Sequence, residues 1–385
     1  MQYTEYELGE LLPFEQPTAY IVKSTDYSDA YATPVLTAGK SFILGKTNET
    51  DGIFDQLPVI IFDDFTTATQ FVNFRFKVKS SAMKILHINT DLVIPKYIFY
   101  RLQIIQFDHS THKRYWIQSY SKIKVLIPPL DEQFRIVARI EELFSELDKA
   151  VDTLKTTKEQ LAVYRQAVLK DAFDNAQAMC ERFTPIEELL VTDRKGMSTG
   201  PFGTMLKKHE HKTTGVPMLG IENIDSGKFI DGNKIFVTPE KATELKSFAL
   251  KSGDIIISRS GTVGELCVVP PRMEGALLST NLMRVSLDCQ KVLPEYFIYL
   301  FQSKGIVLDQ VKELCKGSTR IFLNQTILKQ IQFPIPNVHE QLQIINTIES
   351  RLTFCDNIEK TVDTALAQVD AMRQSILKQS FEGKF

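Results

Sequence analysis

The sequence predicts an α+β protein in which two mixed α/β domains are joined by two long antiparallel helices that pair as a coiled coil. Three observations predict this fold. An internal repeat spans most of the 385 residues, and each copy ends in a long run of apolar residues at helical spacing. Upstream of each run, short β-branched and aromatic stretches alternate with turn-forming residues. At about 150 residues per domain the length fits two or three domains, and the repeat implies a pseudo-two-fold axis.

The repeat is clearest around a Glu-Gln pair. Glu132-Gln133 reappears as Glu340-Gln341 at an offset of 208, and the same offset continues without a gap to Phe173 and Phe381. Toward the start of each half the offset falls in steps, as loop insertions between two copies of one domain would cause. The aligned pairs are Arg114 with Arg320 at 206, Pro95 with Pro294 at 199, Val59 with Ile255 at 196, Pro34 with Pro217 at 183 and Leu11 with Leu189 at 178.

The repeat divides the chain into four segments. In order, they are a first variable domain (1–127), a shared helical segment (128–182), a second variable domain (183–333) and a second shared helical segment (334–385). Within the variable domains we expect short strands bounded by turns and one short helix that begins at a proline. These elements are Val59–Phe62, Phe71–Val78 and the helix Pro95–Ile105, then Ile255–Ser258, Leu282–Leu287 and the helix Pro294–Gln302.

Each shared segment is expected to be one long helix. Apolar residues recur at alternating spacings of three and four after Pro128-Pro129, and the second copy contains neither Pro nor Gly between Gln341 and Phe381. About forty helical residues form a rod of about 60 Å, whose apolar stripe would face water if it stood alone. We therefore expect the two helices to pack on each other. The alternative is two unrelated surface helices that each cover their own domain.

Charge is distributed unevenly among the segments. Lys and Arg number 45 and Asp and Glu 47, which gives a net charge of −2. Over 1–127, 128–182, 183–333 and 334–385 the net charges are 0, −3, +3 and −2. The helices hold the acidic excess and the variable domains are relatively basic, which suits domains that approach an anion.

The composition is that of an ordinary globular chain, with 43% hydrophobic and 24% charged residues. No apolar run reaches the roughly 18 to 20 residues that span a bilayer, and the first residues lack a signal-peptide pattern. We therefore expect no membrane association and a cytoplasmic location. The five cysteines are scattered without a C-x-x-C pair, so we expect reduced thiols and no thiolate zinc site.

No catalytic motif is evident, so we expect no enzyme activity in this chain. Gly39-Lys40-Ser41 lacks the first glycine of a phosphate-binding loop, because Pro34 stands in its place. Asp63-Asp64 has no third carboxylate, and a role in a turn or at a strand end is favoured over a metal site. The pairs His109/His112 and His209/His211 lack further ligands, and no metal site is expected.

The whole layout resembles the specificity subunit of type I restriction-modification enzymes. Besides the alternation of variable and shared segments, four stretches carry the resemblance. They are Gly253 to Gly261 followed by Gly264, the runs Ile123–Gln133 and Ile331–Gln341 that lead into the helices, and Leu8-Gly9-Glu10-Leu11. The first half departs at one point, since Phe62-Asp63-Asp64-Phe65 stands where the second has Ser258-Arg259-Ser260-Gly261. No role of Arg259 is therefore transferred to Asp63.

The resemblance implies a non-catalytic DNA-recognition subunit. Residues 1–127 and 183–333 would be target recognition domains that each bind one half of a bipartite, asymmetric site in double-stranded DNA. Residues 128–182 and 334–385 would be conserved helical spacers that hold the halves apart and dock two methyltransferase subunits, and two restriction (motor-nuclease) subunits would join them. This chain would bind no cofactor, and S-adenosylmethionine, ATP and Mg would belong to the partner subunits.

Candidate DNA contacts are polar side chains expected on solvent-facing loops beside the strands. In the first domain they are Lys40, Lys46, Asn48, Thr66, Thr67, Thr69, Gln70, Lys113 and Arg114. In the second they are Lys207, Lys208, Asn223, Arg259, Thr262, Asn281, Lys316 and Arg320. The alignment of Arg114 with Arg320 indicates a phosphate contact that both domains share. The single tryptophan, Trp116, is expected in the core.

A function of a different class is a coiled-coil adaptor that joins two protein partners through its duplicated domains without binding DNA. The net charge of −2 fits such an adaptor more easily than a DNA-binding protein. Salt-dependent retention on DNA in the presence of the methyltransferase separates the two hypotheses, because an adaptor would show no dependence on salt.

Overall fold

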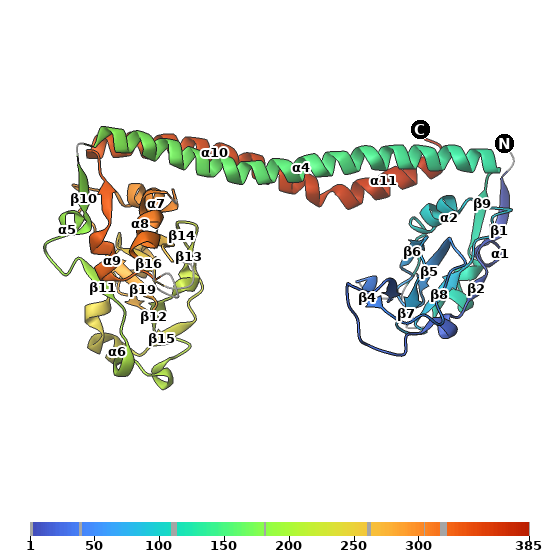
Figure 1. Cartoon of the computed structure of the whole chain (residues 1–385), viewed down its shortest axis with the longest axis horizontal. Helices are drawn as coiled ribbons and strands as arrows, with labels where there is room; N and C mark the ends of the chain where they lie inside the picture. The colour runs from blue at the N-terminus through green and yellow to red at the C-terminus, as the bar shows by residue number, and fades with distance from the viewer. Residues whose placement is uncertain are drawn as a thin grey trace. The chain divides into compact units, whose positions relative to one another are not determined.

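The computed structural model describes residues 3–37, 41–108, 114–180, 182–259, 263–303, 305–315 and 322–384, and the chain forms two compact units. Unit 1 contains Met1–Lys155 and Asp363–Phe385, and unit 2 contains Thr156–Val362. Each unit therefore combines one mixed domain with parts of both helical segments (Figure 1).

The mixed domain of unit 1 contains sheets of strand order β2-β8-β5-β6, β4-β3-β7 and β1-β9. Its strands are β1 (Thr4–Glu7), β2 (Phe14–Glu15), β3 (Thr33–Leu36), β4 (Ile43–Thr47), β5 (Val59–Asp63), β6 (Thr69–Val72), β7 (Lys77–Val78), β8 (Met83–Leu86) and β9 (Lys124–Ile127). Its helices are α1 (Leu8–Leu11), α2 (Pro95–Leu102) and α3 (Tyr115–Gln118), with the 3-10 turns η1 (Pro17–Tyr20) and η2 (Tyr120–Lys122).

The mixed domain of unit 2 repeats these sheets as β11-β19-β16-β17, β15-β12-β18 and β10-β20, and adds the hairpin β13-β14. Its strands are β10 (Phe183–Pro185), β11 (Met197–Thr199), β12 (Val216–Leu219), β13 (Ile224–Asp225), β14 (Lys228–Phe229), β15 (Ile235–Val237), β16 (Ile255–Ser258), β17 (Leu266–Val268), β18 (Leu277–Leu278), β19 (Leu282–Val285) and β20 (Gln332–Pro334). Its helices are α5 (Ile186–Leu189), α6 (Pro239–Glu244), α7 (Pro294–Gln302), α8 (Ile306–Leu314) and α9 (Gln325–Gln330), with the turns η3 (Gly203–Met205), η4 (Lys208–Glu210), η5 (Ile221–Asn223), η6 (Lys246–Phe248) and η7 (Pro271–Met273).

The strand directions confirm that the domains are two copies of one fold. In both units the second sheet contains one parallel pair, β3 with β7 and β12 with β18, while its other pair is antiparallel. The strand expected over Phe71–Val78 is wrong as a single element. Its two ends belong to β6 and β7, which lie in different sheets, so the chain crosses from one sheet to the other between them.

The helical segments are α4 (Leu130–Met179), α10 (Val338–Ala367) and α11 (Val369–Phe381). The first segment is one continuous helix, as expected. The second segment differs, because it is divided at Gln368 into α10 and α11. The N–H of Gln368 donates to the carbonyl of Ala365, three positions earlier, at 3.2 Å, whereas an α-helix bonds residues four positions apart. Such a tightened turn ends α10 without a proline or glycine.

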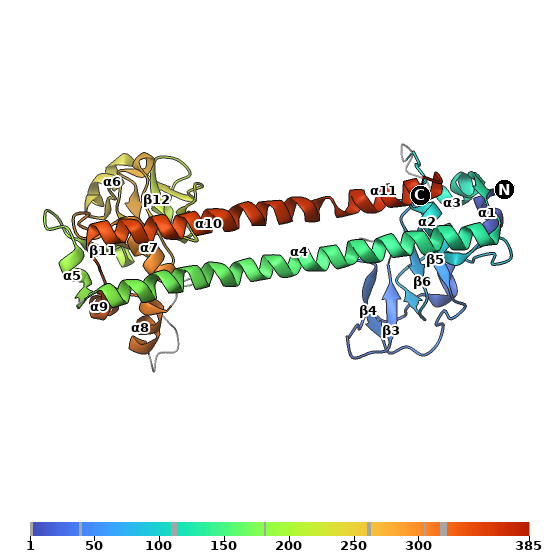
Figure 2. The same ribbon diagram turned by 90° about the horizontal axis from the view of Figure 1, so that it is seen from above.

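The helices run antiparallel in unit 2. The guanidinium of Arg165 on α4 lies 2.6 Å from Asp356 Oδ1 and 2.9 Å from Glu359 Oε2, and Asp171 pairs with Arg351 at 3.4 Å. Residue numbers thus rise along α4 as they fall along α10, and both views show the two helices side by side (Figures 1 and 2). The expected pairing is confirmed, and the alternative of two independent surface helices is wrong.

Burial of the apolar stripe holds the helices together more than the ion pairs do. The paired side chains are partly exposed, and such pairs contribute about 0–1 kcal/mol each. The buried residues of the stripe include Leu161, Val168, Cys355 and Val362. Further along, Leu169, Phe173 and Ile348 join the core of the mixed domain itself, so the helices complete that core.

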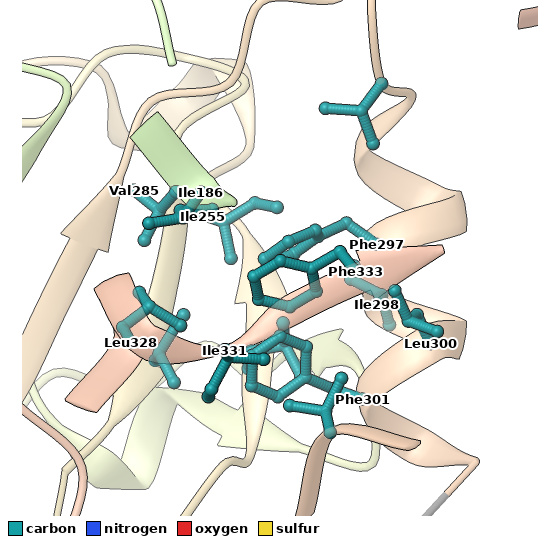
Figure 3. Packing of buried hydrophobic residues seen from close by; sticks show 14 of the residues in the cluster. Ile186, Ile255, Val285, Phe297, Ile298, Leu300, Phe301, Leu328, Ile331 and Phe333 are labelled. Carbon is teal, nitrogen blue, oxygen red and sulfur yellow. The ribbon is translucent and has the colours of Figure 1, made fainter. Parts of the chain in front are cut away.

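The core of each domain lies on both faces of a central strand. In unit 2, Ile255 and Ile257 of β16 belong to the same buried cluster as Phe297 of α7 and Phe333 of β20. Figure 3 shows part of this cluster, with Ile255, Phe297 and Phe333 among the labelled side chains. Ile256 faces the opposite side and joins another cluster. This alternation is that of a strand buried on both faces.

The same alternation corrects the alignment of the two domains at this strand. In unit 1, Ile60 and Phe62 face α2, whereas Val59 and Ile61 face the other cluster. Ile60 therefore corresponds to Ile255, an offset of 195, and the offset of 196 expected from the sequence is wrong. A shift of one residue would place every side chain on the opposite face of the sheet.

The repeated glutamine joins each domain to the helix that follows it. Gln133 Oε1 accepts the N–H of Ile94 at 2.8 Å, and Gln133 Nε2 donates to the carbonyls of Leu92 and Pro128 at 3.0 and 2.9 Å. Ile94 caps α2, so the side chain connects the start of α2 to the start of α4.

Gln341 makes the equivalent contacts in unit 2. Its Oε1 accepts the N–H of Leu293 at 2.8 Å, and its Nε2 donates to the carbonyls of Lys291 and Pro336, both at 2.8 Å. Both glutamines are fully buried, so their amides must find partners, and these bonds satisfy main-chain groups that would otherwise lack them.

A second repeated contact joins each domain to the far end of the other copy's helix. The rings of Tyr97 on α2 and Phe381 on α11 pack edge to face at 5.3 Å, and Tyr296 on α7 packs on Phe173 of α4 at the same distance. Each domain is therefore held by the helix that follows it and by the end of the other helical segment. The pseudo-two-fold relation of the sequence repeat is present in these contacts.

Candidate functional site

Four of the first-domain candidates, Thr66, Thr67, Thr69 and Gln70, lie in or directly after the turn that joins β5 to β6. The carboxylate of Asp63 accepts the N–H of Phe65 at 2.9 Å and the hydroxyl of Thr66 at 2.7 Å, and the N–H of Thr67 donates to the carbonyl of Asp63 at 2.9 Å. The turn role expected for Asp63 is confirmed. Thr66 and Gln70 are exposed here and Thr67 is half-buried, but Thr69 is buried and accepts a bond from the side chain of Gln103.

Arg114 lies beside this turn. The N–H of the next residue, Tyr115, donates to the carbonyl of Asp64 at 3.0 Å, and Arg114 itself is exposed. Lys46 lies on β4, in another sheet, and is half-buried. Asn48 follows the end of β4 and is exposed. Among the described residues, no hydrogen bond or ion pair connects these two to the turn.

Asp64 is buried, and its carboxylate is paired within the domain. Its carboxylate lies 3.3 Å from the ammonium of Lys84 on β8 and accepts the N–H of Trp116 at 2.9 Å. The side chains of Asp64 and Lys84 are 2% and 0% exposed, so this is a buried ion pair. Trp116 is also buried, as expected. No pattern in the sequence indicated Lys84 as the partner of Asp64.

In unit 2, Arg259 and Asn281 come together at the end of β16. The guanidinium of Arg259 donates to the carbonyls of Thr280 at 3.1 Å and Leu323 at 3.3 Å, and its main-chain N–H donates to the carbonyl of Asn281 at 3.0 Å. Arg259 is half-buried and Asn281 is exposed. These contacts bring the ends of β16, β19 and the segment before α9 to one edge of the domain.

The Gly253-Asp254 stretch of the sequence resemblance has a structural role. The buried carboxylate of Asp254 accepts bonds from the guanidinium of Arg194 at 2.5 and 3.1 Å, the hydroxyl of Ser286 at 2.7 Å and the N–H of Lys251 at 2.8 Å. Gly253 has a φ of +83°, which a residue with a side chain rarely adopts. This network fixes the start of β16.

Arg284 is a buried arginine that the sequence did not single out. It lies on β19 opposite Ile256, and its guanidinium donates to the carbonyls of Ala249 and Lys195 at 3.0 and 2.8 Å. Burial lowers the pKa of Arg284 from its ordinary value, and the nearby carboxylate of Asp254 opposes that shift. Arg284 is only 5% exposed, so its guanidinium holds these two loops from within the domain.

The expectation that Asn223 faces solvent is wrong. Its side chain is 0% exposed, its amide oxygen accepts the N–H of Gly220 at 2.9 Å and its amide nitrogen donates to the carbonyl of Ile230 at 2.9 Å. It stabilises the loop after β12. Lys207 and Lys208 are exposed, as expected, at the start of η4.

The remaining candidates cannot be placed, since Lys40, Lys113, Thr262, Lys316 and Arg320 lie outside the described residues. Even so, the alignment of Arg114 with Arg320 is wrong. Tyr115 donates to Asp64 as Leu323 donates to Arg259, so Phe322 stands where Arg114 stands in unit 1, at an offset of 208. The arginine at this edge thus comes from a different segment in each domain.

Two functional classes find no support in the part of the chain that the structure describes. No group of three or more His, Cys, Asp or Glu side chains is arranged to hold a metal ion there. Among the same residues, no helix has the length and hydrophobicity that a membrane span requires.

Comparisons with known proteins agree with the fold. Residues 202–368 match the family described as "Type I restriction modification DNA specificity domain". The specificity subunit of the EcoR124I/EcoR124II type I restriction enzyme of Escherichia coli is 31% identical over 367 residues, which cover 91% of this chain and 87% of that protein. The EcoKI specificity subunit of Escherichia coli strain K12 is 27% identical over 69% of this chain and 58% of its own length.

Solved structures show the same architecture. The HsdS subunit of Thermoanaerobacter tengcongensis matches with a TM-score of 0.56 at 15% identity, covering 100% of this chain and 97% of that one. A chain from a structure titled for the complex assembly and conformational transition of the type I R-M system matches with a TM-score of 0.63 at 16% identity, over 98% and 97%. At these identities the likeness concerns the fold.

Proposed function

The chain belongs to the DNA specificity subunits of type I restriction-modification systems, and on that premise we propose that each mixed domain binds one half of a bipartite, asymmetric DNA site. Subunits of this family are the non-catalytic component. The observation that carries the proposal is the duplication of one domain fold within a chain that resembles a known specificity subunit over 91% of its length. Two copies with different loops suit a site with two different halves.

In this proposal residues 1–127 and 183–333 are the two target recognition domains. The DNA-facing edge of the first is the β5–β6 turn with Arg114, and that of the second is the end of β16 with Arg259 and Asn281. Exposed hydroxyl, amide and guanidinium groups at these edges are the side-chain types that read base edges in the major groove and contact phosphates.

Residues 128–182 and 334–385 act as helical spacers. Support comes from α4, whose 50 residues form an unbroken helix that begins in unit 1 and ends in unit 2. A continuous helix resists bending and twisting, so it would fix the number of base pairs between the two half-sites, as dimer geometry does for paired DNA-binding motifs.

The partners are two methyltransferase subunits and two restriction subunits, which would carry S-adenosylmethionine, ATP and Mg. Exposed apolar side chains recur at equivalent places of the two helical segments, at Phe134 and Leu342 and at Tyr164 and Met372. A surface present twice in one chain suits two copies of one partner. A complex that acts on chromosomal DNA would reside in the cytoplasm.

The test is a map of methylated bases. A host would express this chain with its methyltransferase, and a second host the methyltransferase alone. A bipartite methylated motif should appear in the first host only, and replacing residues 1–127 by the corresponding domain of another specificity subunit should change one half of that motif. An assembled complex that adds no motif would favour the adaptor hypothesis.

A further inference from the structure

Each domain presents an exposed phenylalanine at the edge described above. Phe65 follows Asp64 in the β5–β6 turn and its side chain is 49% exposed. Phe202 follows β11 in unit 2 and is 65% exposed. A single exposed apolar side chain is common on protein surfaces. These two differ from an ordinary surface residue in how firmly their backbones are held and in what lies beside them.

Hydrogen bonds to a buried carboxylate hold the turn that carries Phe65. Asp63 is 6% exposed, and its carboxylate accepts the N–H of Phe65 at 2.9 Å, the N–H of Thr66 at 3.4 Å and the hydroxyl of Thr66 at 2.7 Å. Thr67 adopts a φ of +59°, which threonine rarely does, while its N–H bonds the carbonyl of Asp63. A buried carboxylate and a strained residue thus fix the backbone on both sides of Phe65.

The loop that carries Phe202 is held by different means. The hydroxyl of Thr280 donates to the carbonyl of Pro201 at 2.5 Å. A Cβ atom at Gly200 would collide with the carbonyl of Ser279, so only glycine allows this close approach. Gly203, on the other side of Phe202, has a φ of +63°. The loop therefore stays against the start of β19 while the phenylalanine side chain points away from the core.

An arginine accompanies each phenylalanine. In unit 2 the carbonyl of Thr280 accepts the guanidinium of Arg259, and the hydroxyl of the same threonine holds Pro201. In unit 1 the carbonyl of Asp64, next to Phe65, accepts the N–H of Tyr115, next to Arg114. In each domain, a phenylalanine with a fixed backbone thus lies close to an arginine. The hydrogen bonds that join them are made by these residues or by their near neighbours in the chain.

We propose that Phe65 and Phe202 act as wedges that insert between neighbouring base pairs of the half-site bound by their own domain. Separating two stacked base pairs costs a few kcal/mol, so an effective wedge must have a rigid backbone and a neighbouring contact that holds the phosphates in place. The bracing hydrogen bonds supply the first and Arg114 and Arg259 the second. This inference rests on the proposed function and adds a residue-level source of specificity to it.

The wedge makes a specificity contribution that base-edge contacts alone do not. Pyrimidine–purine steps unstack most easily, so a wedge favours such a step at one position in each half-site even where no side chain reads the bases. A phenylalanine that instead lay flat against the methyl group of a thymine would require that base at one position and leave the stack intact. The experiment below distinguishes the two.

The test uses the complete chain bound to its methyltransferase and DNA that contains the methylated motif found for that complex. The fluorescent base 2-aminopurine, which brightens when it unstacks, replaces one adenine at a time across both half-sites. The methylated bases themselves are left unsubstituted, because a methyltransferase extrudes its target base from the stack without any wedge. The wild-type complex should brighten one position in each half. F65A should abolish the signal in one half and F202A in the other, each with a loss of affinity of about 5- to 100-fold.

Three further variants keep the outcome interpretable. F65W and F202W should retain the signal, because tryptophan can also insert. F183A removes a phenylalanine of similar exposure on β10, outside the proposed edge, and should leave signal and affinity unchanged. Thermal melting of each variant shows whether it has folded.

The inference is overturned if the wild-type complex binds its motif selectively but every 2-aminopurine stays dark, or if F65A and F202A leave the signals intact. A loss of affinity on replacing a thymine by uracil, without brightening, would assign the phenylalanines to methyl contacts. A wild-type complex with no selective binding at all would instead overturn the proposed function.

Discussion

The two domains place opposite charges at the same point of their central strands. At the end of β16 the guanidinium of Arg259 bonds main-chain carbonyls at the domain edge. At the corresponding end of β5, Asp64 is buried against Lys84. At the starts of the strands the ion pair is in the other domain. Asp254 pairs with Arg194 just before β16 in unit 2, whereas Val59, at the equivalent place in unit 1, lies in an apolar cluster. Each domain has one such ion pair beside its central strand, directly after β5 in unit 1 and directly before β16 in unit 2.

The contacts that both domains share lie on the opposite side, toward the helices. Gln133 and Gln341 make the same three hydrogen bonds, and Tyr97 and Tyr296 pack on Phe381 and Phe173 at the same distance. The central strands thus differ between the domains at both of their ends, whereas the junction with the helices is the same in both. The charge at the end of the central strand can therefore differ between the domains while the contacts that hold each domain to the helices stay the same.

The largest expected effect concerns the buried pair of unit 1. Asp64→Ala should lower the free energy of unfolding of that unit by about 3–5 kcal/mol, because Lys84 stays buried without a counter-charge. Hydrogen exchange of the β5 and β8 amides in the full chain measures the loss, with unit 2 as internal reference. The double variant D64L/K84M removes both charges and should recover most of it. Equal losses in the single and double variants would contradict the ion-pair argument.

Removing the helix-end phenylalanines tests whether the shared contacts are equally important. Phe173→Ala should destabilise unit 2 by about 3–5 kcal/mol, since Phe173 is 1% exposed and a cavity would remain. Phe381 is only partly buried, so F381A should cost unit 1 about half as much. Protease sensitivity of the two units, measured in the same digest, gives the comparison. A larger effect at Phe381 would contradict the packing argument.

The glutamines should give smaller and nearly equal effects. Gln133→Ala and Gln341→Ala each leave a buried N–H and two carbonyls without a partner, which costs about 1–3 kcal/mol. Thermal unfolding of both variants should show similar shifts. Gln166→Ala, which changes a partly buried glutamine elsewhere on α4, serves as the control and should shift the transition less. A clear difference between Q133A and Q341A would break the equivalence of the two junctions.

Arg259→Ala should scarcely change stability, by less than about 1 kcal/mol, in contrast to D64A at the equivalent place. If Arg259 contacts phosphate, the variant complex should bind DNA about tenfold more weakly regardless of sequence, and the slope of log affinity against log salt should fall by about 1. Arg351→Ala removes an arginine from the helix pair and should leave the slope unchanged. An unchanged slope with relaxed sequence preference would assign Arg259 to base reading.

The sequence by itself determined the duplication, the paired helices and the family. The offset of 208 runs without a gap through segments of fixed helical period, where an insertion would rotate the apolar stripe out of the seam. Gln133 and Gln341 stood out as repeated residues for the same reason. The turn role of Asp63 also followed from local chemistry, since a short carboxylate after a strand bonds the N–H groups that follow it.

Only the tertiary structure decided the register of the central strands and the fate of the polar candidates. Val59 to Phe62 and Ile255 to Ile257 are apolar at every position, so the sequence has no alternation of polar and apolar residues to show which side chains face which side of the sheet. An alignment shifted by one residue therefore matches the two sequences equally well. Asn223 and Thr69 look like their exposed neighbours in sequence, yet both are buried, because burial of a polar side chain depends on whether distant main-chain groups fold into hydrogen-bonding reach.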